Sequence, residues 1–270
     1  MKEVLHRCLL EIRRKKQKAK YSVPAVDSAF RILRLLSRKK FSDSTVTEIA
    51  NALELQPTTC FRILQQLKES SIVTFHEKSK RYRLGPYLVV LGERAKENSL
   101  DLALVLPYLE KISENTGLTS VIVSRVGKMK TTIVAKVEGG DFGVHVSVGR
   151  HFSIEAGAYG KCLLAYMPPE EQQDIFRELH ESDTFEDVSK IQQELPSVVE
   201  KGYATNYGES IEGIFGVAAP IFNVNHDVEM SICLFGMTAR LKQDELEELG
   251  SYLHSISKEI SRKIQGAEQF

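Results

Sequence analysis

Two helical patterns in residues 45–67 are separated only by a very short break, Leu55 and Gln56, and this limits how the segment can fold. Ahead of the first apolar run, Thr45 and Glu48 have the Ser/Thr-x-x-Glu spacing of a capping box. The second pattern begins at Pro57, and proline is favoured at the first position of a helix. Short helices joined this tightly must turn sharply against each other, so the segment predicts a helix-turn-helix.

The second of these helices has two unlike faces. At about 100° per residue, one apolar stripe forms that can pack inward, and it comprises Cys60, Ile63, Leu64 and Leu67. The opposite face has uncharged hydrogen-bonding groups and one arginine, where a plain surface helix, the alternative, would more often have Glu and Lys pairs. Because such groups suit base edges and phosphates, the candidates for DNA contact are Thr58, Thr59, Phe61, Arg62, Gln65 and Gln66.

A β-hairpin is expected next, because two short β-type runs, 71–75 and 81–84, flank the charged sequence HEKSK. A hairpin that follows a helix-turn-helix is the wing of a winged helix. Lys78, Lys80 and Arg81 would then lie beside the DNA backbone or enter a minor groove. A charged tip is also ordinary for any exposed turn, so this reading stays open.

A further helix is expected before the pair, in PAVDSAFRILRLLSRKK. Its apolar residues repeat at helical spacing, which is typical of a helix: Val26, Ala29, Phe30, Leu33 and Leu36. Three basic residues end the segment, where the helix dipole favours cations. Together with the hairpin, these helices complete a winged helix-turn-helix over residues 22–85.

The net charge of the whole chain is zero, but its two parts carry opposite charges. Residues 1–97 hold 21 Lys and Arg against 10 Asp and Glu, whereas residues 98–270 hold 15 against 26. A basic first part suggests a polyanionic partner, because cations that neutralise phosphates release counterions. The basic tail, residues 1–21 with RRKKQKAK at 13–20, would add affinity for DNA without specificity.

The remainder of the 270 residues suits a second domain. Helices are expected at 87–97, as a linker, and at 104–115, 157–167, 169–180, 187–202 and 241–264. Strand-like alternation occurs at 118–126, 130–137, 143–148, 202–207, 214–223 and 228–237. Mixed, mostly antiparallel strands with helices grouped between them indicate an α+β domain.

Several classes of protein are disfavoured. No apolar run approaches the roughly 18 residues of a membrane helix, and the order of residues 1–20 reverses that of a secretory signal, so we expect a cytoplasmic protein. The four cysteines are far apart and have no CxxC spacing, so neither a metal nor a disulfide framework is expected. Common catalytic and cofactor motifs are missing. An enzyme or thiol-reactive sensor that uses Cys162 or Cys233 is the alternative from another class.

The order of elements and several stretches resemble the IclR family of bacterial transcriptional regulators over residues 22–266. The matching stretches are VPAVDSAFRIL, TVTEIANALELQPTTCFRILQQL, YRLG, AYGKCLLAYMPPEE, KGYAT, GVAAPIF and a long closing helix. The resemblance implies a winged helix at 22–85, a linker helix at 86–103 and a GAF-like effector-binding domain at 104–270. It also implies a transcriptional regulator, a repressor more often than an activator, that binds operator DNA as a homodimer or homotetramer and responds to a small molecule without any cofactor.

The resemblance also implies functional residues. The family's recognition helix falls on Thr58, Thr59, Phe61 and Arg62, where the phenylalanine could contact a thymine methyl or fold back toward the core. Its effector pocket falls on Ala158, Tyr159, Asn206, Ile214, Gly216, Cys233 and Phe235. Tyr159 and Phe235 replace smaller family residues, so the effector should have an aromatic or apolar part. The alternative is a pocket filled by these side chains and a regulator that acts without a ligand.

The linker helix is a candidate surface for pairing two copies of the chain. It contains the apolar residues Leu88, Val89, Leu91 and Ala95. Bacterial operators are usually bound by two-fold symmetric pairs, which makes a single copy insufficient. The alternative is that this surface packs against its own winged helix.

Overall fold

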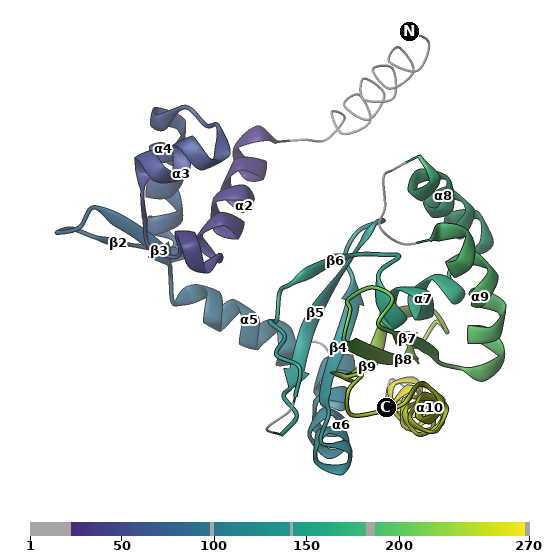
Figure 1. The fold of residues 1–270 in the computed structure, drawn as a ribbon. Helices are drawn as coiled ribbons and strands as arrows, with labels where there is room; N and C mark the ends of the chain where they lie inside the picture. The colour runs from purple at the N-terminus through teal and green to yellow at the C-terminus, as the bar shows by residue number, and fades with distance from the viewer. Residues whose placement is uncertain (1–22, 98–99, 141–142, 182–186, 268–270) are drawn as a thin grey trace, which may run out of the picture. The chain divides into compact units, whose positions relative to one another are not determined.

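The computed structural model describes residues 23–97, 100–140, 143–181 and 187–267 (Figure 1). The basic tail predicted at residues 1–21 lies outside these ranges. The chain divides into two compact units, Met1–Ala95 and Lys96–Phe270, each with its own hydrophobic core. Within the described ranges, no helix is both long enough and apolar enough to span a membrane.

The first unit is the predicted winged helix-turn-helix. Its elements are α2 (Pro24–Leu36), β1 (Ser44–Thr45), α3 (Val46–Leu53), α4 (Pro57–Glu69), β2 (Val73–His76), β3 (Arg81–Leu84) and α5 (Tyr87–Glu97). The three strands form an antiparallel sheet in the order β1-β3-β2. The expected helix pair and wing are therefore confirmed, with the first wing strand beginning at Val73 rather than at Ser71.

Local chemistry sets the tight turn between α3 and α4. Thr45 caps α3 by accepting a hydrogen bond from the Glu48 amide at 3.3 Å, and the Glu48 carboxylate accepts one from the Thr45 amide at 2.7 Å. Glu54 ends α3 in a left-handed conformation, with φ of 55°. Pro57 then begins α4 at its first turn, as predicted.

The predicted first helix is confirmed as α2, and the core of the first unit shows which of its sides is buried. Val26 and Phe30 are 51% and 56% exposed, while the buried side chains of α2 are Ile32, Leu35 and Leu36. The helix is apolar over more than one stripe, and only one of its sides faces α3, α4 and the sheet. Helical spacing alone could not say which stripe is buried.

The second unit contains a six-stranded sheet in the order β6-β5-β4-β9-β8-β7, in which all neighbouring strands are antiparallel. The strands are β4 (Thr119–Arg125), β5 (Lys130–Val137), β6 (His151–Ser153), β7 (Ala204–Tyr207), β8 (Ile214–Phe222) and β9 (Val228–Met237). The helices are α6 (Leu100–Thr116), α7 (Gly157–Ala165), α8 (Pro169–His180), α9 (Val188–Lys201) and α10 (Leu246–Ala267). This arrangement confirms the expected α+β class.

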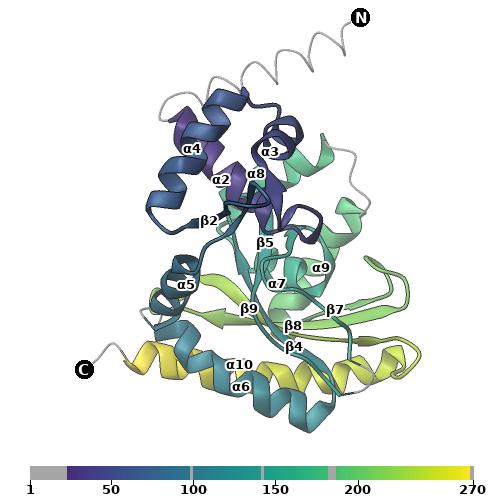
Figure 2. The ribbon, with the colours of Figure 1, turned by 90° about the vertical axis from the view of Figure 1, so that its left-hand side faces the viewer.

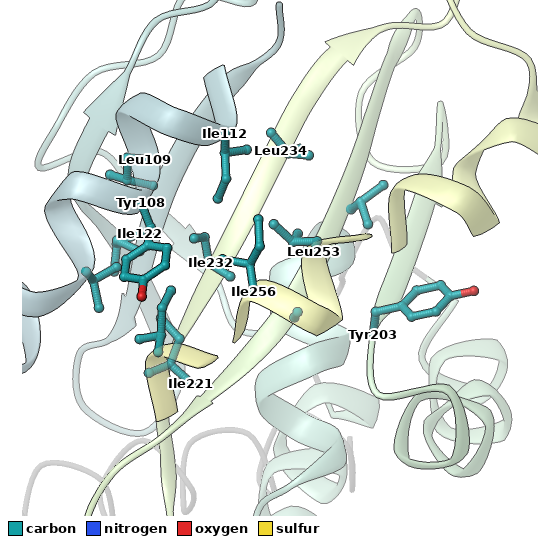
Figure 3. Packing of buried hydrophobic residues seen from close by; sticks show 14 of the residues in the cluster. Tyr108, Leu109, Ile112, Ile122, Tyr203, Ile221, Ile232, Leu234, Leu253 and Ile256 are labelled. Atoms are coloured by element: carbon teal, nitrogen blue, oxygen red, sulfur yellow. The ribbon is translucent and has the colours of Figure 1, made fainter. Parts of the chain in front are cut away.

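Helices cover both faces of the sheet. Helices α6 and α10 lie side by side on one face (Figure 2), where residues such as Tyr108, Ile122, Ile232 and Leu253 pack together (Figure 3). Helix α7 covers the opposite face and packs against α9 in turn. Successive strand residues point to opposite faces, so the sheet separates two apolar clusters.

Two predicted elements of this unit are corrected. Residues 143–148 are not a strand, although Val146 is buried against the α7 side of the sheet. Their alternation reflects an irregular segment that covers apolar side chains, and the edge strand β6 begins only at His151. The helix expected at 104–115 begins earlier, at Leu100, and ends before Gly117, whose φ of 68° stops it as predicted.

Candidate functional site

The first half of α4 carries four of the predicted DNA-contacting residues, Thr58, Thr59, Phe61 and Arg62, which together form its reading face. Thr58, Thr59 and Arg62 are exposed, and Phe61 is 48% exposed, so its ring does not fold back into the core. Cys60 and Leu64 are fully buried on the opposite side. The apolar stripe thus fixes which way the polar face of α4 points.

The two glutamines that follow are engaged within the first unit. Gln65 is half-buried, and its Nε2 donates a hydrogen bond to the Tyr82 hydroxyl at 3.2 Å. Gln66 is exposed, and its Nε2 donates to the Glu69 carboxylate at 3.2 Å. The predicted DNA-contacting side chains of α4 therefore differ in exposure and in whether they are already hydrogen-bonded within the first unit.

The predicted cations of the wing also differ. Lys78 is exposed at the hairpin tip, and Lys80 lies 3.5 Å from a carboxylate oxygen of Glu77. Arg81 instead points back to α3, where its guanidinium lies 3.3 Å from Glu48 and donates to the Asp43 carbonyl at 2.6 Å. Of these three cations, Arg81 is the one bound to the body of the domain.

A second arginine of the wing, which the sequence analysis did not single out, repeats this pattern. Arg83 donates two hydrogen bonds to the Asp43 carboxylate, at 2.9 and 3.1 Å. The hydrogen bond from Arg83 lowers the pKa of Asp43 below its usual value. The hydrogen bond from the Thr45 amide does most to lower the pKa of Glu48. Both carboxylates therefore stay charged and hold the wing to α3 and to the segment before it.

An apolar groove of about 820 Å³ lies beside the reading face, within the first unit. Its walls come from α2, α4 and α5: Ala25, Val26, Ala29, Phe30, Leu33, Thr59, Arg62, Ile63, Gln66, Leu67, Leu88 and Leu91, with Ile72 between α4 and the wing. The exposed stripe of α2 forms one wall, and two of the apolar residues predicted for the linker helix form another. The groove is thus lined mainly by apolar side chains that are in contact with water, and exposed apolar patches of this kind mark interaction sites.

In the second unit, the predicted effector residues come together on one face of the sheet. The register places Asn206, Gly216 and Phe235 in one row across β7, β8 and β9. Ile214 and Cys233 lie two residues away along β8 and β9, and therefore on the same face. Ala158 and Tyr159 belong to α7, which covers this face.

An aromatic cluster lies between α7 and the sheet. The Tyr159 ring lies 5.3 Å from that of Phe152 and 6.1 Å from that of Phe235, measured between centroids. Tyr159 and Phe235 are 5% and 8% exposed, and Ala158 and Cys233 are fully buried. A Cβ atom at Gly216 would lie 3.4 Å from the Phe235 ring, which is ordinary van der Waals contact, so the ring packs directly over this strand position.

An ionic cluster around a buried lysine borders the aromatic side chains. Lys161, which is only 4% exposed, lies 2.6 Å from Glu194 and 2.7 Å from Glu209. Burial raises the pKa of Glu209, but hydrogen bonds from Lys161 and Lys190 outweigh burial and hold it below its usual value. Asn206 donates to the same Glu209 carboxylate at 3.0 Å. Of this set, only Asn206 was predicted from the sequence.

The thiols do not have the properties of reactive cysteines. Cys162 and Cys233 are fully buried. Burial raises the pKa of Cys233 to about 12, and that of Cys162 well above its usual value. A reactive thiol needs access to solvent and a lowered pKa, so neither residue suits thiol chemistry.

Both units match models of one protein family. Residues 25–77 match the IclR helix-turn-helix domain, and residues 98–262 match the C-terminal domain of bacterial transcriptional regulator IclR. The crystal structure of an IclR transcriptional regulator from Alicyclobacillus acidocaldarius is 34% identical, covers 90% of this chain and 100% of that chain, and superposes with a TM-score of 0.81. The HTH-type transcriptional regulator KipR of Bacillus subtilis is 25% identical, with 82% of this chain and 89% of KipR covered.

A more distant structure shares the fold. It is an IclR homologue from Microbacterium hydrocarbonoxydans in complex with 4-hydroxybenzoate, 17% identical, with a TM-score of 0.75 over 90% of this chain and 99% of that chain. The two family models together cover most of the chain, in the order that the winged helix and the α+β unit require. The chain belongs to the IclR family and is a DNA-binding transcriptional regulator.

Proposed function

We propose that this regulator binds operator DNA through the first half of α4, with Thr58, Thr59, Phe61 and Arg62 in the major groove. The observation that carries the proposal is that these side chains are exposed together on the helix that follows the tight turn. Arg62 can donate two hydrogen bonds to a guanine, and the Phe61 ring can contact a thymine methyl group. Lys78 and Lys80 on the wing add contacts to phosphates.

Selection of DNA from a pool of random duplexes tests this assignment. The purified protein should enrich a defined sequence, and its affinity for that duplex should fall steeply as salt is raised. The Arg62→Ala variant should lose affinity for the selected duplex more than for unrelated DNA. Equal losses on both would make Arg62 a phosphate contact, and enrichment of no sequence would contradict the proposal.

We further propose that the α2 and α5 walls of the groove pair two copies of the chain and leave Thr59 and Arg62 of its α4 wall to DNA. Phe30, at 56% exposed, and Val26, at 51%, form an apolar wall that pairing would remove from water. Leu88 and Leu91 bring the linker helix into the same groove. This surface thus combines the predicted pairing residues of α5 with the stripe of α2 that the domain's own core leaves open.

Sedimentation of wild-type protein and of Phe30→Asp tests this surface. The wild type should be a dimer or larger at micromolar concentration, and the variant should dissociate to a smaller species and lose DNA affinity. Val199→Asp, another exposed apolar side chain but in the second unit, is the matched control and should not change the assembly. A wild type that sediments as a monomer would contradict pairing.

For the second unit, we propose that a small molecule with an aromatic or apolar part binds between α7 and the sheet and releases the repressor from its operator. The cluster of Phe152, Tyr159 and Phe235 supports an aromatic group, and the nearby Asn206 supports a polar one. A fold relative that binds 4-hydroxybenzoate makes a hydroxylated aromatic acid the first compound to test.

The buried positions of these side chains favour a second candidate, a unit whose pocket is filled and which regulates without a ligand. A thermal-shift screen of aromatic and aliphatic acids separates the two. A ligand that binds only the folded protein raises its unfolding temperature in proportion to the logarithm of its concentration. The double variant Tyr159→Ala, Phe235→Ser should instead respond to smaller polar acids. No response from either protein would favour the filled pocket.

A further inference from the structure

The contact between the recognition helix and the wing reassigns one of the predicted DNA-binding residues. Gln65 Nε2 donates to the Tyr82 hydroxyl at 3.2 Å, so a side chain of α4 is bound to the centre of β3. We propose that Gln65 and Tyr82 form a positioning pair that fixes the rotation of α4 about its axis, and that Gln65 does not read bases. This inference rests on the proposed use of α4 in the major groove.

Tyr82 is an anchor because it is immobilised from several sides. It is 2% exposed, and β3 carries it between its strand partners Ser44 and Phe75. Its ring lies 4.6 Å from the Phe75 ring, measured between centroids. Burial raises the pKa of the Tyr82 hydroxyl, so the group stays protonated and neutral. A helix tethered to such a group is tethered to the sheet as a whole.

The position of Gln65 along α4 makes this tether effective. Arg62 precedes Gln65 by three residues, which is about 4.5 Å along a helix axis at about 1.5 Å per residue. Leu64, the neighbour of Gln65, is fully buried and resists translation of the helix, but an apolar contact is not directional. A hydrogen bond is directional, so Gln65 narrows further the rotation of α4 that the buried stripe of Cys60 and Leu64 already sets.

The same geometry argues against a base contact by Gln65. Recognition of adenine by glutamine uses the amide as donor and acceptor at once, toward the base edge in the major groove. In Gln65 the amide nitrogen already donates to a buried acceptor, and the side chain is half-buried. Arg81, which is bound to Glu48 and Asp43, likewise strengthens the attachment of the wing instead of extending toward DNA.

A double-mutant cycle tests the positioning pair on the intact protein. The variants are Gln65→Ala, Tyr82→Phe and their combination, and affinities are measured for a duplex selected by the wild type and for a scrambled duplex. Each single variant should lose roughly 5-fold affinity for the selected duplex, the range expected from one net hydrogen bond, and much less for the scrambled one. The double variant should lose no more than either single variant, because both remove the same contact.

Gln66→Ala combined with Tyr82→Phe is the matched control, since Gln66 bonds to Glu69 and not to the tyrosine. Its effect should add to that of Tyr82→Phe. Additive losses for Gln65→Ala and Tyr82→Phe would overturn the inference, as would a loss of preference at a single base pair in Gln65→Ala alone. Tyr82→Phe keeps the buried ring, so thermal unfolding should show that each variant is folded. Failure to select any duplex would contradict the proposed function itself and is thus distinguishable.

Discussion

The two candidate sites of this regulator place their chemistry in opposite environments. On the recognition helix, Arg62 and Phe61 are exposed and supported from behind by buried neighbours. Between α7 and the sheet, Tyr159 and Lys161 are almost completely buried. A substitution on the recognition helix can alter DNA binding without altering the fold. A substitution between α7 and the sheet also alters the core of the second unit. We therefore expect substitutions to separate binding from stability at one site and to couple them at the other.

The largest effect should come from the aromatic cluster. Tyr159→Ala removes a buried ring between Phe152 and Phe235, and should lower the free energy of unfolding by about 4 kcal/mol, as for other large-to-small core substitutions. Phe61→Ala is the matched control, because its exposed ring should contribute less than about 0.5 kcal/mol. Denaturant unfolding measures both. Similar losses for the two variants would remove the contrast between the sites.

The buried lysine should follow closely. Lys161→Met keeps a long side chain but removes the buried cation from Glu194 and Glu209, which keep only Lys190, and this should cost about 2 kcal/mol of stability. Lys128→Met breaks the more exposed pair with Glu178, and this should cost no more than about 1 kcal/mol. Thermal unfolding of the two variants in one buffer gives the comparison. A harmless Lys161→Met would mean that the carboxylates find other partners.

Arg62→Ala should weaken DNA binding and leave the stability of the protein unchanged. We expect a loss of about 1 to 3 kcal/mol in affinity for the selected operator, the value of a bidentate base contact, with no change in the unfolding midpoint. Arg62→Lys keeps the charge but cannot form the two-pronged contact, so it should recover binding to unrelated DNA more than to the operator. A lowered unfolding midpoint for Arg62→Ala would contradict this expectation, because it would mean that Arg62 also stabilises the folded state.

The smallest effect should come from the carboxylates that hold the wing. The lowered pKa values of Asp43 and Glu48 mean that their ionised forms stabilise the folded state. This contribution is complete above their usual values of 3.8 and 4.5, and is lost as the pH falls through and below them. Asp43→Asn with Glu48→Gln should therefore flatten the decline in unfolding temperature between about pH 5 and pH 3. An unchanged decline would assign it to other groups.

The helix-turn-helix and wing could be predicted because their signals are local. The capping box at Thr45, the proline at 57 and the two strand runs each report on a few neighbouring residues, and all were confirmed. The buried stripe of α2 could not be predicted in this way, because its choice depends on which side meets the rest of the domain. Residues 143–148 were wrongly expected to be a strand for the same reason, since covering an apolar face and pairing in a sheet give similar alternation.

The candidate sites also combine features that local sequence predicts with contacts between elements that it does not predict. The composition of α4 indicates its exposed face directly, but it does not indicate that Gln65 turns inward to Tyr82, which lies on another element. The effector residues were expected only from the family resemblance, and the structure brings Tyr159, Asn206 and Phe235 to one face of the sheet. Their assignment to a ligand stays a prediction. Lys161 and its two carboxylates gave no signal in the sequence, because charges that meet across α7, α9 and a loop have no common spacing.

The double contact made by Glu48 has a consequence for the evolutionary divergence of this regulator. One carboxylate completes the cap of α3 and also pairs with Arg81 of the wing. A glutamine at this position would preserve the cap but weaken the ion pair, whereas an alanine would lose both. Drift at residue 48 should consequently be narrow, and descendants that lose its charge should tend to replace Arg81 as well. Relatives that acquire new operators would then inherit the turn and the wing as one unit and vary the exposed residues of α4.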